Sequence, residues 1–256
     1  MNRLAPYTRE RGSTMSELKS KYTNRVVVIS GASGGLGKVV ARQFASSGAK
    51  VVLAGKNAEK LEALGMQLDI PQDRWMSVAV DLTNEEAVSG LLTKVLTKFG
   101  KVDILIHLVG GWIGGKPLEE VKIEDVSEMI DQHILSTFFA AQAFIPKLVE
   151  NKWGRIIVIS SPSAGIPPAN NLPYSVAKAG QEALILTLSE ELRGSGVTAN
   201  IVRVKTIDVN HEKEHSPSSK NAAWTTPEEI TDMIMYLCSE SAGMVNGARI
   251  PLYGSQ

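Results

Sequence analysis

Seven short apolar runs, separated by longer segments with helical periodicity, constrain the fold of this chain more than any other feature. The runs cover residues 25–30, 50–55, 75–80, 103–109, 155–160, 198–204 and 248–253. They are apolar throughout rather than alternating, as is typical of parallel strands covered on both faces. The helical patterns lie near residues 36–47, 57–67, 84–98, 119–150, 174–193 and 227–238. This alternation predicts right-handed βαβ units and a doubly wound parallel α/β sheet of about seven strands.

The predicted sheet accounts for one domain. We expect residues 24–256 to form it, with helices on both faces of the sheet, and residues 1–23 to be a flexible polar arm. Residues 208–225 are polar and carry no periodic pattern, so we expect a surface loop that acts as a lid.

Composition limits the partners of this chain. Its 27 basic and 27 acidic residues form no block of one sign, which argues against nucleic acid or an anionic membrane. No run of about 18 apolar residues is present to span a membrane. The single cysteine, Cys238, fits a reducing cytoplasm. We therefore expect a cytoplasmic protein that binds a small molecule and no metal.

A glycine-rich turn separates the first strand from the first helix. Glycine permits a tight turn, close approach of the backbone to a pyrophosphate, and close packing of helix on strand. The amino end of the helix then offers N–H groups and a partial positive charge to phosphate. These features favour a nucleotide site over an ordinary turn. The expected site residues are Gly31, Ser33, Gly34, Gly35, Leu36 and Gly37.

The residues at the end of the second strand determine whether a dinucleotide with a ribose 2′-hydroxyl or with a 2′-phosphate is preferred. It offers no acid for a ribose hydroxyl but offers Lys56, and a cation there favours the 2′-phosphate of NADP over NAD. The alternative is a solvated lysine at a helix start. Asp81, followed by Leu82, ends the third strand and is placed to accept from the adenine amino group. It would otherwise cap the helix that starts near Asn84.

Tyr174 and Lys178 lie four residues apart on a helical pattern and therefore on one face. A tyrosine with a pKa of about 10 is a poor acid–base at neutral pH. A neighbouring ammonium, aided by a cationic nicotinamide, stabilises the phenolate and lowers that pKa. Ser161 ends a strand thirteen residues before the tyrosine and would hydrogen-bond a substrate oxygen.

These motifs together resemble the short-chain dehydrogenase/reductase family. The resemblance rests on SGASGGLG, Asp81, Ser161, YSVAK and the carboxyl-terminal segment EEITDMIMYLCSESAGMVNGARI, and it runs from about residue 24 to the end. It implies a Rossmann-type fold, a nicotinamide cofactor and hydride transfer to or from a carbonyl or similar double bond. It also implies that Tyr174 is the general acid–base, that Lys178 holds the ribose, and that Ser161 orients the substrate.

Three positions depart from the family pattern. The usual Asn-Ala-Gly after the fourth strand reads Leu108-Val109-Gly110, with Val109 and Gly110 still expected to lie against the cofactor. His133 replaces the helix asparagine that relays protons through water. Histidine titrates near neutrality and would preserve the relay, or it would pack at a subunit contact. After the sixth strand the usual Pro-Gly is absent, and Thr206 is placed to reach the nicotinamide carboxamide.

The segment GGWIGG at 110–115 is similar to the active-site loop of dihydropteridine reductases. In that branch an indole lies beside the substrate, so we expect Trp112 to form a wall of the substrate pocket with Ser161 and Tyr174. Its alternative role is a structural cover over the loop. Lys56 and Ser161 differ from the usual residues of that branch.

Three functions compete. The first is reduction of a carbonyl compound with NADP(H), as in 3-oxoacyl-carrier or general carbonyl reductases. The second is reduction of a pterin-like or quinonoid ring, and the third is NADP sensing without catalysis. The long helices at 119–150 and 174–193 pair between subunits in the family, so the resemblance also implies a homodimer or homotetramer.

Overall fold

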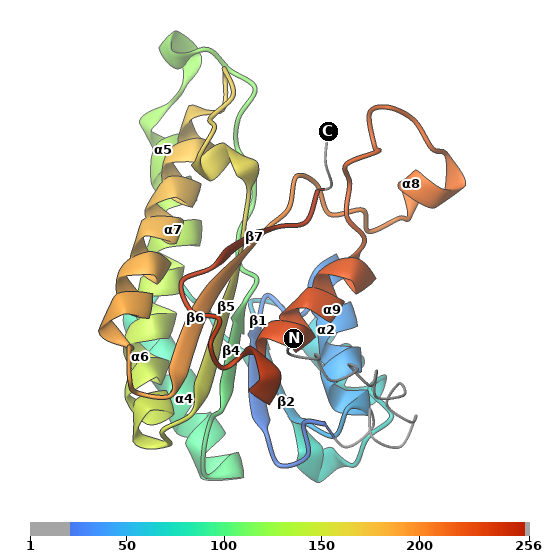
Figure 1. Ribbon diagram of the computed structural model, residues 1–256, viewed down its shortest axis with the longest axis vertical. Coiled ribbons are helices and arrows are strands. Elements are labelled where there is room, and N and C mark those ends of the chain that lie inside the picture. Colours follow the sequence, from blue (N-terminus) through green and yellow to red (C-terminus); the bar gives the residue numbers. More distant parts are fainter. Residues whose placement is uncertain (1–20, 254–256) are drawn as a thin grey trace, which may run out of the picture.

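A parallel seven-stranded sheet forms the centre of the molecule (Figure 1). The computed structural model describes residues 21–253. The strands are β1 (Val26–Ser30), β2 (Lys50–Gly55), β3 (Trp75–Ala79), β4 (Ile104–His107), β5 (Gly154–Ser160), β6 (Val197–Arg203) and β7 (Arg249–Pro251). Their spatial order is β3-β2-β1-β4-β5-β6-β7, and all neighbours are parallel. The order reverses between β1 and β4, where open α/β sheets bind ligands.

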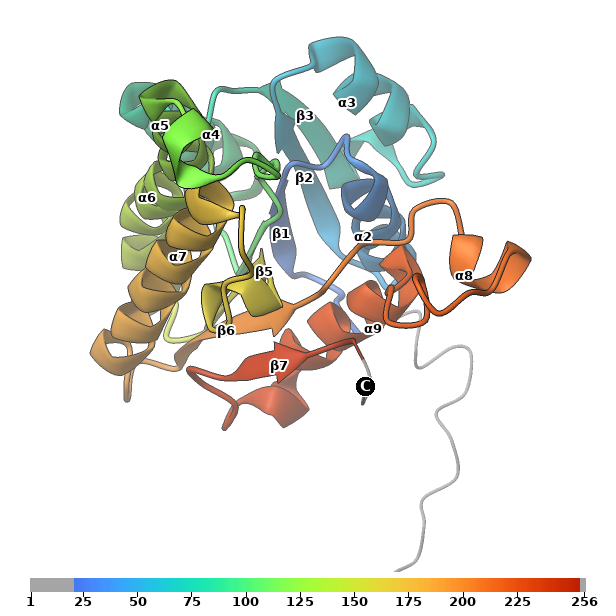
Figure 2. The same cartoon turned by 90° about the horizontal axis from the view of Figure 1, so that it is seen from above.

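Helices cover both faces of this sheet, as Figure 2 shows from above. They are α2 (Gly35–Ser46), α3 (Ala58–Met66), α4 (Glu85–Phe99), α5 (Ile123–Ile130), α6 (Ser136–Glu150), α7 (Leu172–Glu191), α8 (Glu212–His215) and α9 (Pro227–Leu237). Side chains of α2, α3 and α9 pack on one face of the sheet, and those of α4, α6 and α7 pack on the other. The two cores confirm the predicted doubly wound architecture.

Alternate residues of each central strand enter opposite cores. In β1, Val27 and Ile29 belong to the core under α2 and α9, whereas Val26 and Val28 belong to the core under α4 and α6. All five residues of β1 are buried, so neither face of this strand is exposed to solvent. This double burial explains why the strand was apolar throughout its length.

The predicted helical segment 119–150 is interrupted. Between α5 and α6 lies a π-helical segment, Asp131–Leu135, which continues the same axis with a wider turn. Such segments are frequent at functional sites because they displace one side chain from the regular helical face. Here the displaced segment carries His133, which is buried.

The ends of the domain differ slightly from expectation. Residues 1–20 of the predicted arm lie outside the described residues. Tyr22, which that arm included, is buried edge-on against Phe44 and donates its hydroxyl to the Met235 carbonyl. The packed domain therefore begins earlier than residue 24. The predicted loop 208–225 contains the short helix α8 and is closed at its neck by a bridge between Ile207 and Thr225.

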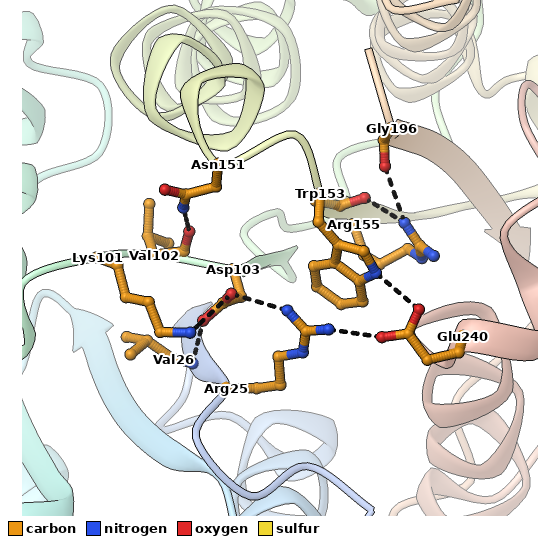
Figure 3. Close-up of polar contacts among 11 residues, drawn as sticks. Arg25, Val26, Lys101, Val102, Asp103, Asn151, Trp153, Arg155, Gly196 and Glu240 are labelled. Carbon is orange, nitrogen blue, oxygen red and sulfur yellow. Dashed lines mark hydrogen bonds and ion pairs between the residues drawn. The ribbon is translucent and has the colours of Figure 1, made fainter. Parts of the chain in front are cut away.

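The amino ends of the strands are held together by charged side chains (Figure 3). Asp103, at the start of β4, accepts hydrogen bonds from Arg25 at 3.1 Å and from the Val26 backbone N–H at 2.8 Å. Lys101 also reaches this carboxylate, and Arg25 pairs in addition with Glu240 at 2.5 Å. These contacts fix the register between β1 and β4 at the edge opposite to the carboxyl ends of the strands.

Within residues 21–253, no helix combines the length and the apolar character that a membrane crossing requires.

Candidate active site

Two adjoining cavities lie at the carboxyl ends of β1, β2, β4, β5 and β6. Their volumes are about 320 and 380 Å³, and both are lined by Gly31, Gly34 and Gly110. Every residue expected to bind the cofactor lines one or the other. These residues are Gly31, Ser33, Gly34, Gly35, Leu36, Gly37, Lys56, Asp81, Leu82, Val109, Gly110, Tyr174, Lys178 and Thr206. The fold therefore brings together residues spread over most of the sequence.

The glycine turn between β1 and α2 is packed too closely against neighbouring backbone to accept larger residues. Gly31 has a φ of +76°, a conformation that favours glycine. A Cβ on Gly37 would lie 2.5 Å from the Gly31 carbonyl oxygen. The N-cap of α2 is Gly34, which offers no side chain to the first helical N–H groups. Those N–H groups are therefore placed to bind phosphate.

Two buried polar atoms beside the same cavity have no partner among the described residues. They are Oγ of Ser160 and Nδ1 of His133. Buried polar atoms are nearly always hydrogen-bonded in folded proteins. Together with the open helix end and the glycine turn, these atoms fit a nicotinamide dinucleotide.

The adenosine end of the site contains an ion pair. Lys56 lies 3.1 Å from the carboxylate of Asp81, and both side chains are exposed. Hydrogen bonds from the Thr83 backbone and hydroxyl, helped by Lys56, lower the pKa of Asp81. The helix α4 is capped by Asn84 itself, which accepts from the Ala87 N–H, so the alternative that Asp81 caps this helix is wrong.

Tyr174 and Lys178 of α7 both line the cavity of about 320 Å³. The Lys178 ammonium is 95% buried and donates to the Ile159 carbonyl at 2.7 Å and to Gln181 Oε1 at 2.9 Å. Because its partners are neutral, burial dominates and lowers the pKa of Lys178 to about 7, against a smaller opposing effect of Glu182. The ammonium lies 5.8 Å from the centre of the Tyr174 ring.

The pKa of Tyr174 corrects one expectation. Burial raises this pKa above its ordinary value, and a hydrogen bond with Ser161 opposes the increase. The sequence had led us to expect a pKa lowered by Lys178. In the protein chain alone, desolvation of the phenolate outweighs any such effect. Tyr174 is therefore held in its protonated form, as a proton donor requires.

His133 lies beside Tyr174, with ring centres 5.6 Å apart in an edge-on arrangement. Its Nε2 is 3.0 Å from the Gly111 carbonyl oxygen, while Nδ1 has no partner in the described chain. Burial lowers the pKa of His133 to about 3, and Lys178 adds to this effect. Titration near neutrality is therefore wrong. The alternative of a subunit contact is also wrong, because only 1% of the residue is exposed within a single chain.

Gly110 is required by this histidine. Its φ is +153°, and a Cβ there would lie 2.1 Å from Cε1 of His133. The glycines after β4 thus allow the chain to pass between the imidazole ring and the cofactor cavity.

Sequence reasoning missed a second buried histidine, His107, at the end of β4. Its Nδ1 is 2.8 Å from the Ser30 hydroxyl, and its Nε2 is 3.0 Å from the Ser136 hydroxyl. Burial, and to a smaller extent Lys178, lowers the pKa of His107 to about 3. The signal was a polar residue inside an otherwise apolar strand. This histidine joins β1, β4 and α6 below the site.

Gln181 was also missed. It is fully buried, accepts from Lys178, and donates from Nε2 to Thr137 Oγ1 at 2.9 Å. Thr137 in turn donates to the His133 carbonyl at 2.6 Å. A continuous hydrogen-bonded chain therefore links the lysine to the π-helical segment. Because Gln181 occupies an ordinary helical position, the sequence carried no signal for it.

A third cavity, of about 650 Å³, lies next to Ser161 and is also lined by Trp112. Ser161 follows β5 and caps a short 3₁₀ turn, Pro162–Ala164, by accepting from the Ser163 N–H. Trp112 is 62% exposed and lines this cavity together with Ser161, whereas Tyr174 lines the cofactor cavity. Among the residues that the structure describes, no cluster of three or more His, Cys, Asp or Glu side chains is arranged to hold a metal ion.

Comparison with known proteins agrees with this architecture. The family model described as short chain dehydrogenase matches residues 25–220. An uncharacterized oxidoreductase of Staphylococcus aureus (strain USA300) is 31% identical over 218 residues, which are 85% of this chain and 92% of the relative. The BbsD subunit of a hydroxy(phenyl)methylsuccinyl-CoA dehydrogenase from Thauera aromatica is 32% identical over 244 residues, or 91% and 96% of the two chains.

Solved structures show the same fold. A short chain dehydrogenase from Bacillus anthracis superposes with a TM-score of 0.82 at 29% identity, covering 90% of this chain and 95% of that one. A short-chain dehydrogenase/reductase from Brucella melitensis, titled glucose/ribitol dehydrogenase, gives a TM-score of 0.81 at 26% identity, covering 93% and 100%.

Proposed function

The chain belongs to the short-chain dehydrogenase/reductase family of NAD(P)-dependent oxidoreductases, and from this premise we propose that it transfers hydride between NADP(H) and a carbonyl or alcohol substrate. The observation that carries the proposal is the convergence of Ser161, Tyr174 and Lys178 beside the dinucleotide cavity. The bound cofactor supplies the hydride donor or acceptor.

Tyr174 transfers the proton in this proposal. Burial keeps its hydroxyl protonated, and its hydrogen bond with Ser161 directs it toward the cavity that holds the substrate. In the direction of reduction, Tyr174 donates its proton to the substrate oxygen while the Ser161 hydroxyl hydrogen-bonds the same oxygen. The role of Tyr174 reverses in the direction of oxidation.

Lys178 and His133 complete the proton path. Two neutral acceptors hold the Lys178 ammonium in place, and its lowered pKa of about 7 lets it exchange a proton at neutral pH. His133 presents a neutral Nδ1 without a partner in the described chain, which is placed to accept from a water in the cavity. It would thereby replace the asparagine that is usual in the family.

NADP is the proposed cofactor because of Lys56. Its ammonium lines the adenosine end of the site, and Asp81 lies close enough to hold it there. A 2′-phosphate would bind this ammonium, whereas NAD offers no charged group to it.

The substrate is proposed to be a carbonyl compound of the 3-oxoacyl or general ketone type. The Thauera relative bears a name that describes dehydrogenation of a hydroxyacyl thioester, which supports this class. A pterin-like or quinonoid ring is the second candidate. One observation favours it, namely the exposed indole of Trp112 beside Ser161.

The test is a substrate panel of ketones, 3-oxoacyl thioesters and a quinonoid dihydropterin, assayed with NADPH and with NADH. We expect turnover of a carbonyl compound with NADPH. Lys56→Ala should reduce the preference for NADPH over NADH by about 5-fold, since the lost contact is exposed. Unchanged preference would remove Lys56 from the site, and turnover of the pterin alone would establish the second candidate. Lys60→Ala, an exposed lysine on α3, is the matched control.

A further inference from the structure

Gln181 lies on α7, about one helical turn after Lys178, and is fully buried. A buried amide side chain has lost its contacts with water and needs partners within the protein. It finds them on both sides, because Oε1 accepts from the Lys178 ammonium at 2.9 Å and Nε2 donates to Thr137 Oγ1 at 2.9 Å. Gln181 therefore connects the buried lysine of α7 to the first turn of α6.

Thr137 fixes the direction of these hydrogen bonds. A threonine hydroxyl has one proton to donate, and Thr137 donates it to the His133 carbonyl at 2.6 Å. Its oxygen can then only accept, so the Gln181 amide presents Nε2 to Thr137 and Oε1 to Lys178. The reverse orientation would place the N–H groups of the amide against the ammonium. The π-helical carbonyl thus determines, through two side chains, that Lys178 meets an acceptor.

The Lys178 ammonium carries three N–H groups, and the protein chain uses two of them. One donates to the Ile159 carbonyl at 2.7 Å and the other to Gln181 Oε1. Because two bonds on a tetrahedral nitrogen set the direction of the third, the remaining N–H is oriented before a cofactor binds. Lys178 lines the cofactor cavity, whereas Gln181 does not. Without Gln181, the ammonium would keep one acceptor and could turn about that single bond.

We propose that Gln181 is a positioning residue, whose amide oxygen holds the Lys178 ammonium in the orientation in which it binds the cofactor beside Tyr174. Thr137 holds the amide in turn. An acceptor on a charged donor also favours the charged form, so Gln181 helps Lys178 to remain protonated. This inference rests on the proposed function for the reaction that Lys178 serves. It adds to that function a residue that acts through another.

The titratable residues that face Lys178 or line the same cavity are His107, His133, Tyr174, Glu182 and Lys205. Both histidines have a pKa of about 3 and stay neutral above pH 6. Burial raises the pKa of the tyrosine, and the Glu182 carboxylate is paired with Arg203. Burial lowers the pKa of Lys178 to about 7, so this group changes charge in the neutral range.

The test measures binding of NADPH, or of NADH where it binds more tightly, to the full-length protein between pH 6 and 9 by nicotinamide fluorescence. We expect affinity to fall as the pH rises through the pKa of Lys178, because the neutral amine binds the cofactor less well. Gln181→Leu should lower the midpoint by about one pH unit, since the ammonium loses an acceptor. Gln181→Glu should raise it by about one unit or more, since a carboxylate then faces the ammonium.

A matched control is Gln142→Leu, the same substitution at an exposed position of α6, which should leave the midpoint unchanged. Ionisation of the cofactor is common to all variants, so differences between their midpoints report the protein. Two further variants test the hydroxyl of Thr137. Thr137→Ser should keep the midpoint, whereas Thr137→Val should lower it by about half a unit, because the amide is then free to turn. A packing role alone would favour valine, which has the shape of threonine.

Midpoints that move in the same direction in Gln181→Leu and Gln181→Glu, or that do not move, would overturn the inference. Equal midpoints in Thr137→Ser and Thr137→Val would also overturn it, and this pair decides if Gln181→Leu fails to fold. These measurements do not depend on turnover. If the midpoints shift as expected while no carbonyl compound is reduced, the proposed reaction fails and the role of Gln181 stands. If reduction occurs with unchanged midpoints, the reverse holds.

Discussion

Asp103 at the amino ends of the strands and Lys178 at the carboxyl ends are both buried charged residues, but only Asp103 has oppositely charged hydrogen-bond partners. Asp103 is 97% buried in its side chain and binds Arg25 and Lys101. Lys178, buried to a similar degree, has only neutral acceptors within hydrogen-bonding distance in the described chain. The first arrangement fixes strands. The second leaves an ammonium whose proton is easily lost, as its lowered pKa reflects.

The two edges also treat aromatic residues differently. At the amino edge, the guanidinium carbons of Arg25 and Arg155 lie 3.5 and 4.4 Å from the centre of the Trp153 ring, and Trp153 donates to Glu240 (Figure 3). At the carboxyl edge, Trp112 is held through its nitrogen alone. Trp153 is thus packed against charged side chains at one edge of the sheet, whereas Trp112 is exposed beside a cavity at the other.

Lys178→Met should produce the largest effect. Removing the ammonium leaves Tyr174 without its neighbouring cation, and we expect kcat/KM to fall by about 1000-fold, within the range of general acid–base catalysis. Folding should persist, because methionine fills the same buried space. Steady-state kinetics with circular dichroism checks both points. A variant with full activity would show that this buried cation has no catalytic role.

Asp103→Ala should reduce the stability of the protein and leave its activity unchanged, which is the opposite of the result expected for Lys178→Met. It leaves Arg25 and Lys101 without their buried partner and the Val26 N–H without an acceptor, so we expect a loss of about 3 kcal/mol in the free energy of unfolding. kcat of the folded variant should not change. Urea denaturation and an activity assay at low temperature measure the two quantities. A fall in kcat without a loss of stability would contradict the division between the edges.

Acid should destabilise the carboxyl edge through its buried histidines. The pKa of His107 and of His133 falls from 6.5 to about 3 on folding, so the unfolded chain binds more protons between these values. The stability that these groups contribute is therefore complete above pH 6.5 and is lost as the pH falls toward 3. The free energy of unfolding therefore depends on pH in this range. His107→Asn should reduce that dependence by about 1 kcal/mol per pH unit. An identical slope would show that His107 is not held neutral.

The sequence predicted the parts of the site that local patterns encode. Periodicity placed Tyr174 and Lys178 on one helix face, and the resemblance to the family joined them to the glycine turn, with which they line one cavity. Gly110 and His133 are distant in the sequence and come into contact because His133 lies in a π-helical segment. The hydrophobic periodicity of the sequence does not predict such a segment. The expected titration of His133 near neutrality was wrong because its pKa depends on burial, which only the packed structure determines. Burial also raises the pKa of Tyr174 in the protein chain, whereas the predicted lowering included the effect of a cationic nicotinamide.

The contrast between two tyrosines, Tyr174 and Tyr22, tests the account most directly. Tyr174 faces the cofactor cavity, whereas the hydroxyl of Tyr22 donates to the Met235 carbonyl beside the amino edge. With the best substrate of the panel, NADPH consumption should fall by about 1000-fold in Tyr174→Phe and remain unchanged in Tyr22→Phe. Tyr22→Phe should instead lose about 1 kcal/mol of stability. Full turnover in Tyr174→Phe would contradict the account.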